Sequence, residues 1–236
     1  MSADPGQRHL SWYVSACLYR LSYFQLAHQL DDELFHYLGE KVNGSVVADC
    51  GCGPGVVAQK FLESGARQVF AIDGNPPMIS QVHARLVQAI ASRRVIPVLR
   101  RFHPGLFGEL SQTYLGGSGF DILLFKRSLY SQPEQALLVL QAAIGCLNPG
   151  GVLALVHAER SVRRYAFGPG MRWQPYTAYH LLNRLFSLLG RRLGLGEYML
   201  YTQTELIALA RRAAPDKMVE IIPSGQQAYN LVAIRA

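Results

Sequence analysis

Cysteine is scarce in this sequence, and the four that occur are scattered along 236 residues. So few thiols are typical of a protein from a reducing compartment, and we expect a cytoplasmic location. Cys50 and Cys52 lie too close for an easy disulfide, and no other pair of Cys or His has zinc-finger spacing. We therefore interpret them as small side chains that fit a crowded turn, rather than as metal ligands or redox centres.

Long apolar runs and a secretory leader are also lacking. The chain has no run of about 18 apolar residues, so we expect no membrane span. The first residues, MSADPGQRHLSW, have no charged start followed by an apolar stretch, which predicts no signal peptide. Repeats, low-complexity segments and long Pro/Gly/Ser linkers are missing too. Half of the residues are hydrophobic and only 17% are charged, which is typical of one compact domain with a sizeable core.

The positive charge is concentrated in the last third of the chain. Residues 1–150 carry 12 basic against 11 acidic side chains, whereas residues 151–236 carry 11 against 5. The stretch from Arg160 to Arg192 holds seven arginines and no acid. Such a segment can attract an acidic ligand, a nucleic acid or an anionic membrane, or it can be an ordinary solvated face.

Short apolar strands alternate with helices along most of the chain. Strands are expected at residues 45–50, 68–73, 95–99, 120–125 and 152–158, and helices at 56–65, 76–93, 133–147 and 202–212. This alternation predicts a parallel sheet covered by helices on both faces. Two further strands, within 218–225 and 229–236, lie too close together for a crossover helix. They must pair antiparallel, so the sheet ends in a hairpin.

A glycine-rich turn, DCGCGPG from Asp49 to Gly55, joins the first strand to the first helix. In an open α/β sheet a nucleotide-like ligand binds at such a turn. Glycine there lets the backbone curl under the ligand and present its amides. A dinucleotide site would need Gly-x-Gly-x-x-Gly, but the sixth place holds Val56.

The pattern Asp-x-Gly-x-Gly-x-Gly instead resembles the glycine motif of class I S-adenosylmethionine (SAM) dependent methyltransferases. The resemblance extends from about Ser45 to the end of the chain and includes Asp73, which ends the second strand 24 residues after Asp49. The terminal hairpin and the LNPGG before the fifth strand also match the family. The resemblance implies an α/β, doubly wound, Rossmann-like sheet of seven strands in the order 3-2-1-4-5-7-6, with strand 7 antiparallel. It also implies SAM as cofactor and S-adenosylhomocysteine as product.

The resemblance assigns cofactor-binding roles residue by residue. The residues concerned are Asp49, Gly51, Cys52, Gly53, Gly55, Asp73, Asn75 and Met78. Gly51, Cys52 and Gly53 are expected to line the methionyl part, with Asp49 in a supporting role. Asp73 is expected to hold the ribose hydroxyls, and Asn75 and Met78 to pack around the adenine, although Met78 could equally be a core residue. The chain departs from the family after the third strand, where residues 100–103 include no acid for the adenine amino group.

Methyl transfer from a sulfonium is an in-line displacement, so the protein mainly positions the nucleophile and excludes water. Two candidate catalytic residues follow the fourth and fifth strands: Tyr130, to orient the acceptor, and His157, as a general base. Each has a plainer interpretation, as a packed tyrosine and as a buried histidine bonded to the backbone. No metal is expected, because Lys126 and Arg127 place cations at that edge. The sequence leaves O-, N- and C-methylation open.

The chain is predicted to be a single methyltransferase domain with four parts. They are an aromatic-rich N-terminal helical lid at 8–40, a SAM-binding core at 45–158, a substrate-side insertion at 160–200, and the last helix with the terminal hairpin at 201–236. The alternative for the first part is a helix that packs on the sheet and does not act as a lid. Within the insertion, residues 176–192 predict a basic amphipathic helix that closes the pocket, lies on a membrane or makes a homodimer contact.

The predicted function is methyl transfer from SAM to a small, largely apolar or aromatic metabolite, with an acidic group as an option. One alternative is an RNA or protein methyltransferase, suggested by a pI near 9.4. No nucleic-acid partner is expected, because no RNA-binding module is appended and leucines interleave the basic segment. The other alternative is a SAM-binding protein without transferase activity.

Overall fold

The computed structural model describes residues 31–129, 133–158, 201–222 and 229–236. Three sequence predictions lie outside these ranges: most of the lid at 8–40, the candidate Tyr130, and the insertion at 160–200 with its helix at 176–192. They stay predictions.

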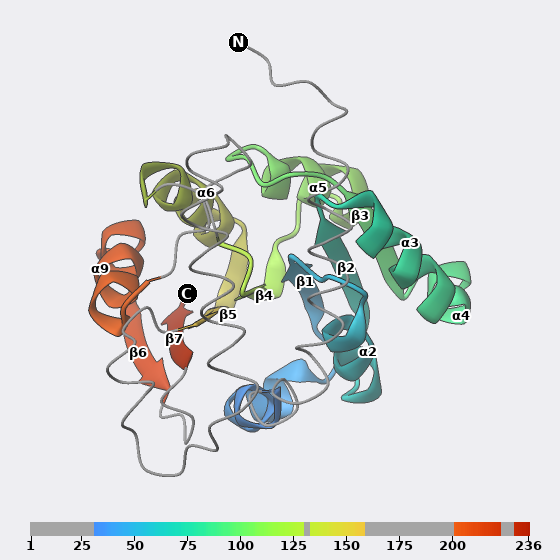
Figure 1. Ribbon diagram of the computed structural model, residues 1–236, viewed down its shortest axis with the longest axis horizontal. Helices are drawn as coiled ribbons and strands as arrows, with labels where there is room; N and C mark the ends of the chain where they lie inside the picture. The colour runs from blue at the N-terminus through green and yellow to red at the C-terminus, as the bar shows by residue number, and fades with distance from the viewer. Residues whose placement is uncertain (1–30, 130–132, 159–200, 223–228) are drawn as a thin grey trace, which may run out of the picture.

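A seven-stranded sheet forms the centre of the molecule (Figure 1). Its strands are β1 (Val46–Cys50), β2 (Gln68–Asp73), β3 (Val95–Leu99), β4 (Phe120–Lys126), β5 (Leu147–Ala158), β6 (Met218–Ile222) and β7 (Tyr229–Arg235). Their spatial order is β3-β2-β1-β4-β5-β7-β6. Strands β1 to β5 pair in parallel, and β7 is antiparallel to both β5 and β6. The predicted fold class, strand order and terminal hairpin are therefore confirmed.

Helices cover both faces of this sheet. They are a helix at residues 31–38, η1 (Gly39–Val42), α2 (Val56–Glu63), α3 (Pro76–Arg85), α4 (Val87–Ala91), α5 (Leu106–Leu115), α6 (Pro133–Gly145) and α9 (Gln203–Ala213). Buried residues of α5, α6 and α9 pack with one set of strand side chains, and those of 31–38, α2 and α3 pack with the other. This is the expected three-layer arrangement, because successive side chains of a strand point to opposite faces.

The N-terminal helix shows how the described part of the predicted lid is placed. Leu34 and Leu38 are fully or almost fully buried in the same cluster as α2, and Phe35 contacts Phe61 with ring centroids 4.7 Å apart. The Tyr37 hydroxyl donates to Glu220 Oε2 at 2.8 Å, which ties the helix to β6. Residues 31–38 thus pack against α2 and β6, and a lid remains a prediction for residues 8–30.

Three local details differ from the sequence predictions. The single helix expected at 76–93 is divided into α3 and α4 at Leu86, whose side chain is buried. Helix α5 was not predicted. The NPGG segment belongs to β5, which begins at Leu147, with a register shift against β4 and a positive φ at Gly150. The helix predicted at 202–212 is confirmed as α9, which begins with a capping box: Thr202 Oγ1 accepts from the Glu205 N–H, and Glu205 accepts from the Thr202 N–H.

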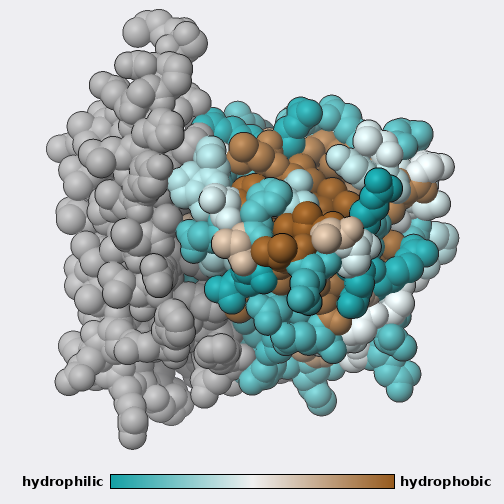
Figure 2. All heavy atoms as spheres, turned by 90° about the vertical axis from the view of Figure 1, so that its right-hand side faces the viewer, coloured by the Kyte–Doolittle hydropathy of each residue, from teal (hydrophilic) through white to brown (hydrophobic). Residues whose placement is uncertain are grey.

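The β3 edge of the sheet is partly apolar on its surface. Figure 2 shows the corresponding side of the molecule, where hydrophobic residues gather between hydrophilic ones. The exposed large hydrophobic side chains on β3 and on the helices near it include Val87 on α4, Leu99 on β3 and Tyr114 on α5. Pro97 lies in the middle of β3 and removes one backbone donor, which disfavours pairing with another strand. Within the described ranges, none of the helices combines the length and apolar character needed to cross a membrane.

Candidate cofactor site

The glycine-rich turn between β1 and α2 lies at the carboxyl edge of the parallel strands. Gly51, Gly53 and Gly55 all have positive φ, at 77°, 54° and 79°. Side chains with a Cβ rarely adopt this left-handed backbone, so the alternation of glycines follows from the path of the turn. The N–H groups of Gly51 and Cys52 both donate to Ile72 O, at 2.7 and 3.0 Å, which fastens the turn to β2.

Two of these glycines also meet side chains that the sequence did not point to. A Cβ on Gly51 would lie 2.1 Å from Ser128 Cβ, and Ser128 Oγ itself donates to Cys50 O at 2.5 Å. A Cβ on Gly55 would lie 3.1 Å from Val82 on α3. The turn is therefore held by close packing against the end of β4 and against α3, and Ser128 is a site residue that sequence reasoning missed.

Asp73 links the turn to the loop that follows β2. Its Oδ2 accepts from the Gly53 N–H at 2.9 Å, and its Oδ1 accepts from the Asn75 N–H at 2.8 Å. Burial raises the pKa of Asp73, and the two backbone hydrogen bonds oppose that rise. A carboxylate offers about four acceptor positions, so two remain after these bonds. The residues fit a ligand with hydroxyl groups at this point.

Asp49 is buried beside the turn, on the sheet face that α2 covers. Its side chain is 2% exposed, and its Oδ2 has no hydrogen-bond partner among the residues that the structure describes. Burial raises the pKa of Asp49 to about 7, attraction to Lys126 opposes the rise, and repulsion from Asp31 and Asp73 adds to it. Asp49 is thus a buried carboxyl group with unused acceptor capacity, which fits the supporting role expected for it.

A buried ion pair lies next to Asp49. Lys126 at the end of β4 pairs with Asp31 at the start of the 31–38 helix, and their side chains are 4% and 3% exposed. Burial lowers the pKa of Lys126, and the Asp31 carboxylate opposes that shift. Sequence reasoning treated Lys126 only as an argument against a metal and did not single out Asp31. No local signal connects two residues that lie 95 positions apart in the chain.

The remaining cofactor candidates are placed as follows. Asn75 is the N-cap residue of α3, and Met78 is 6% exposed in the first turn of that helix. Cys50 and Cys52 are free and buried, and burial raises both thiol pKa values, which makes them unreactive. Their burial agrees with the interpretation of both as packed side chains. In the loop after β3, Phe102 turns inward onto Phe125, with ring centroids 5.4 Å apart.

His157 lies on the opposite face of the sheet from Asp49. Its side chain is fully buried, and its ring meets that of Tyr201 edge to face at 5.2 Å. Burial and the positive charge of Arg127 lower the pKa of His157 to about 3, so the imidazole is neutral at physiological pH. A base this weak takes up a proton with difficulty. Its catalytic role stays a prediction, as does that of Tyr130, which lies outside the described residues.

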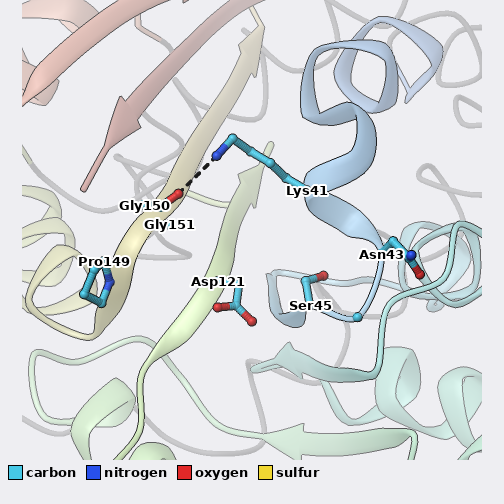
Figure 3. A pocket seen from close by; sticks show the side chains of 8 residues that line it. Lys41, Asn43, Ser45, Asp121, Pro149, Gly150 and Gly151 are labelled. Atoms are coloured by element: carbon cyan, nitrogen blue, oxygen red, sulfur yellow. Dashed lines mark hydrogen bonds between the residues drawn. The ribbon is translucent and has the colours of Figure 1, made fainter.

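A polar groove opens at the other end of the strands (Figure 3). It is lined by Lys41, Asn43, Gly44, Ser45, Asp121, Pro149, Gly150 and Gly151. Lys41 Nζ donates to Gly150 O at 3.2 Å, and the Asp121 carboxylate accepts from the Val46 N–H and from Asn148. Lys41 and Asp121 thus have hydrogen-bond partners of their own, and the groove lies at the amino edge of the strands, away from the glycine turn. Over the described ranges, no three His, Cys, Asp or Glu side chains are grouped so as to hold a metal ion.

Comparison with known proteins identifies relatives of this arrangement. Residues 47–151 match a family model described as a methyltransferase domain. This segment contains β2 to β4, all of β1 except Val46, the glycine turn and Asp73. No curated protein matches the chain by sequence.

Solved structures share the fold over almost the whole chain. An O-methyltransferase family protein from Burkholderia thailandensis has a TM-score of 0.62 and 18% identity, over 91% of this chain and 57% of that one. Human N-acetylserotonin methyltransferase, in complex with SAM, has a TM-score of 0.59 and 15% identity, over 98% and 56%. Magnesium protoporphyrin IX methyltransferase from Synechocystis, with bound S-adenosylhomocysteine, has a TM-score of 0.56 and 14% identity, over 88% and 81%. The chain thus spans little more than half the length of the first two of these proteins.

Proposed function

We propose that this protein transfers a methyl group from SAM to a small, largely apolar or aromatic metabolite, because residues 47–151 match the model of a methyltransferase domain. One observation carries the proposal. Asp73, at the end of β2, accepts a hydrogen bond from Gly53 of the glycine turn, so the two sequence marks of the cofactor site meet at one place. This place is the carboxyl edge of an open parallel sheet, where α/β proteins bind nucleotide-like ligands.

The proposed binding residues are those that the family resemblance implies. The backbone of Gly51, Cys52 and Gly53 approaches the methionyl part of the cofactor, because glycine leaves room for it. Asp73 accepts from the ribose hydroxyls with its remaining lone pairs. Asp49 has a supporting hydrogen-bond role beside the glycine turn, and Asn75 and Met78 pack near the adenine. When bound, SAM would supply a methyl group on a positively charged sulfur. The acceptor takes the methyl group by in-line attack, and S-adenosylhomocysteine is the leaving group.

The catalytic part of the proposal is that the chain orients the acceptor and excludes water, which is sufficient when the acceptor arrives deprotonated. Tyr130 and His157 remain the proposed catalytic residues, with His157 a weak base because burial lowers its pKa to about 3. A small acceptor is supported by the names of several proteins with this fold, which are methyltransferases for mitomycin, N-acetylserotonin and magnesium protoporphyrin IX. A cytoplasmic location is part of the same proposal, as is a role for residues 176–192 at the pocket, a membrane or a dimer contact.

The test has two stages, because binding and transfer are separate claims. Calorimetry with SAM is expected to show one saturable site per chain, and Asp73→Ala is expected to weaken it. Incubation with methyl-labelled SAM and a panel of phenols, aromatic amines and aromatic acids is then expected to give labelled product. Binding without label on any acceptor, including RNA and protein, would instead indicate a SAM-binding protein without transferase activity. No binding of SAM by the folded chain would contradict the proposal.

A further inference from the structure

The β3 edge of the sheet carries a basic surface that the proposed function does not use. Residues 74–108, which run from the end of β2 into the first turn of α5, include five arginines, two histidines and no acidic residue. The arginines are exposed, and they are Arg85, Arg93, Arg94, Arg100 and Arg101. A stretch with charge of one sign attracts partners of the opposite sign. This edge of the molecule is therefore a candidate contact surface for an anionic partner.

Exposed apolar side chains alternate with these cations along the stretch. β3 is the outermost strand, with Arg94 directly before it and Arg100 directly after it. Leu99 at the end of β3 is 49% exposed, and Val87 on α4, which packs beside β3, is 62% exposed. Figure 2 shows this side of the molecule, where hydrophobic residues are bordered by hydrophilic ones. We call the following exposed side chains the β3-edge face: Arg85, Val87, Arg93, Arg94, Leu99 and Arg100.

The positive charges of the β3-edge face are not neutralised by ion pairs. In the part of the chain that the structure describes, none of its four arginines has a carboxylate within salt-bridge distance. Arg94 donates to the backbone carbonyls of Leu62 and Ala66, and Arg85 donates to a backbone carbonyl and to the amide oxygen of Gln59, all of which are neutral. Gln59 in turn donates to Glu63, so one carboxylate lies at the border of the face. Four cations thus remain against one neighbouring anion.

This combination of charge and apolar surface selects among the possible partners. A second copy of the chain fits poorly, because a two-fold contact would set the arginines of the face against the same arginines. An added β-strand fits poorly, because Pro97 in the middle of β3 has no backbone N–H. A nucleic acid would use the arginines for its phosphates but would leave Val87 and Leu99 without a role. A bilayer that contains anionic lipids accommodates both, since its headgroups attract arginine and its interface accepts apolar side chains.

We propose that the β3-edge face docks on the surface of an anionic lipid bilayer. This surface is separate from the contact predicted at residues 176–192. Leu99 is in register with Asp73 on β2, so the face adjoins the carboxyl edge of the sheet that carries the candidate cofactor site. A docked molecule therefore holds that edge beside the bilayer. Each arginine close to an anionic surface strengthens binding roughly fivefold, and the apolar side chains add to this as they leave water.

Two matched pairs of charge variants test the arginines. The full chain is sedimented with vesicles of phosphatidylcholine mixed with phosphatidylserine, and with vesicles of phosphatidylcholine alone, at low and at high salt. Arg93→Gln/Arg100→Gln removes one cation at each end of β3. Arg211→Gln/Lys217→Gln removes two exposed cations at α9 and before β6, at the other edge of the sheet. We expect the first pair to weaken binding to the mixed vesicles roughly tenfold or more, and the second to leave it within about twofold.

A second set of variants tests the apolar side chains, and thermal melting establishes that each variant folds. Val87→Ser/Leu99→Ser removes the apolar part of the β3-edge face, and we expect it to weaken binding to the mixed vesicles roughly fivefold or more. Leu138→Ser/Ile221→Ser changes two similarly exposed side chains on α6 and β6 and should leave binding within about twofold. Where Val87→Ser/Leu99→Ser does not fold, Val87→Ser alone takes its place. Titrations with a single-stranded RNA oligonucleotide and with polyglutamate measure binding to other polyanions.

The outcomes are distinct. Salt-sensitive binding to the mixed vesicles that falls in both variants of the face, and in neither control, supports the proposal. A wild type that does not bind these vesicles overturns it, and so does a loss that is equal in the face variants and the controls. A loss with the arginine pair but not with the apolar pair overturns it in favour of an acidic macromolecule, which the RNA and polyglutamate titrations distinguish. None of these measurements involves SAM, so failure of the proposed function would leave them unchanged.

Discussion

Asp73→Ala is expected to weaken SAM binding at least tenfold in a protein that still folds. The wild-type carboxylate holds the N–H groups of Gly53 and Asn75 at 2.9 and 2.8 Å, and so joins the two loops that flank the proposed ribose position. Alanine removes both backbone hydrogen bonds and every hydrogen bond from Asp73 to the cofactor. The glycine turn therefore loses its link to the loop before α3, and the cofactor loses the side chain proposed to bind its ribose.

The size of this effect follows from the bonds involved. A hydrogen bond to a charged acceptor contributes about 1.5–3 kcal/mol, so two ribose bonds contribute about 3–6 kcal/mol. Water that enters the vacated space replaces part of this, and about 1.4 kcal/mol, or tenfold, is the lower bound. The free energy of unfolding changes less than the affinity. Burial raises the pKa of Asp73, so the charge is itself disfavoured there, and its removal offsets part of the two lost backbone bonds.

Calorimetry of SAM binding to the wild type, Asp73→Ala and Asp32→Asn measures the effect, with thermal melting to establish folding. Asp32 is a suitable control because its side chain is exposed and pairs with Lys60 on α2, and it has no proposed role in the glycine turn. Asp73→Asn keeps the shape but points an amide NH₂ at one backbone N–H, so its affinity should lie near that of the alanine variant. An affinity within twofold of the wild type in folded Asp73→Ala would refute the placement of the ribose at Asp73.

Three further outcomes are expected. Gly51→Ala should lower the free energy of unfolding, measured by denaturant titration, by about 2–5 kcal/mol, because its Cβ would overlap Ser128 at a positive φ. The control Gly116→Ala also has a positive φ but open space around it, so it should lower the free energy of unfolding much less. The melting temperature of the wild type should fall relative to Asp49→Asn as pH rises from about 4 to 7, because the folded state holds a proton on Asp49 that the unfolded state releases near the ordinary pKa of 3.8. Parallel curves for the two proteins would contradict a raised pKa. The wild type should lose stability relative to His157→Gln as pH falls from 6.5 toward 3, because only unfolded His157 takes up a proton in that window; equal losses in both proteins would speak against a buried neutral imidazole.

The sequence determined most of the sheet because its signals are local. Strands such as Gln68–Asp73 and Val95–Leu99 are short apolar runs with the predicted bounds, and the capping box of α9 is contained in four consecutive residues. Helix α5 was missed because glycines surround and interrupt it, although Leu106, Phe107 and Leu110 form its buried stripe. The break at Leu86 was missed for the opposite reason. The periodicity continues through it, but burial of its side chain near Gly55 ends α3.

The same distinction holds for the candidate site. Asp49, Gly51, Gly53 and Gly55 form one continuous motif, and Asp73 ends the next strand, so a local reading of the sequence predicted them. The partners of these residues come from elsewhere in the chain. Ser128 meets the turn across 78 positions, and Asp31 meets Lys126 across 95, because neighbouring elements in the fold are distant in sequence. The sequence by itself therefore determined which backbone turn can hold a cofactor, since the glycine motif and the strand before it each consist of consecutive residues. Only the tertiary structure decided which charges surround that turn, since an ion pair depends on the distance between side chains and not on their spacing along the chain.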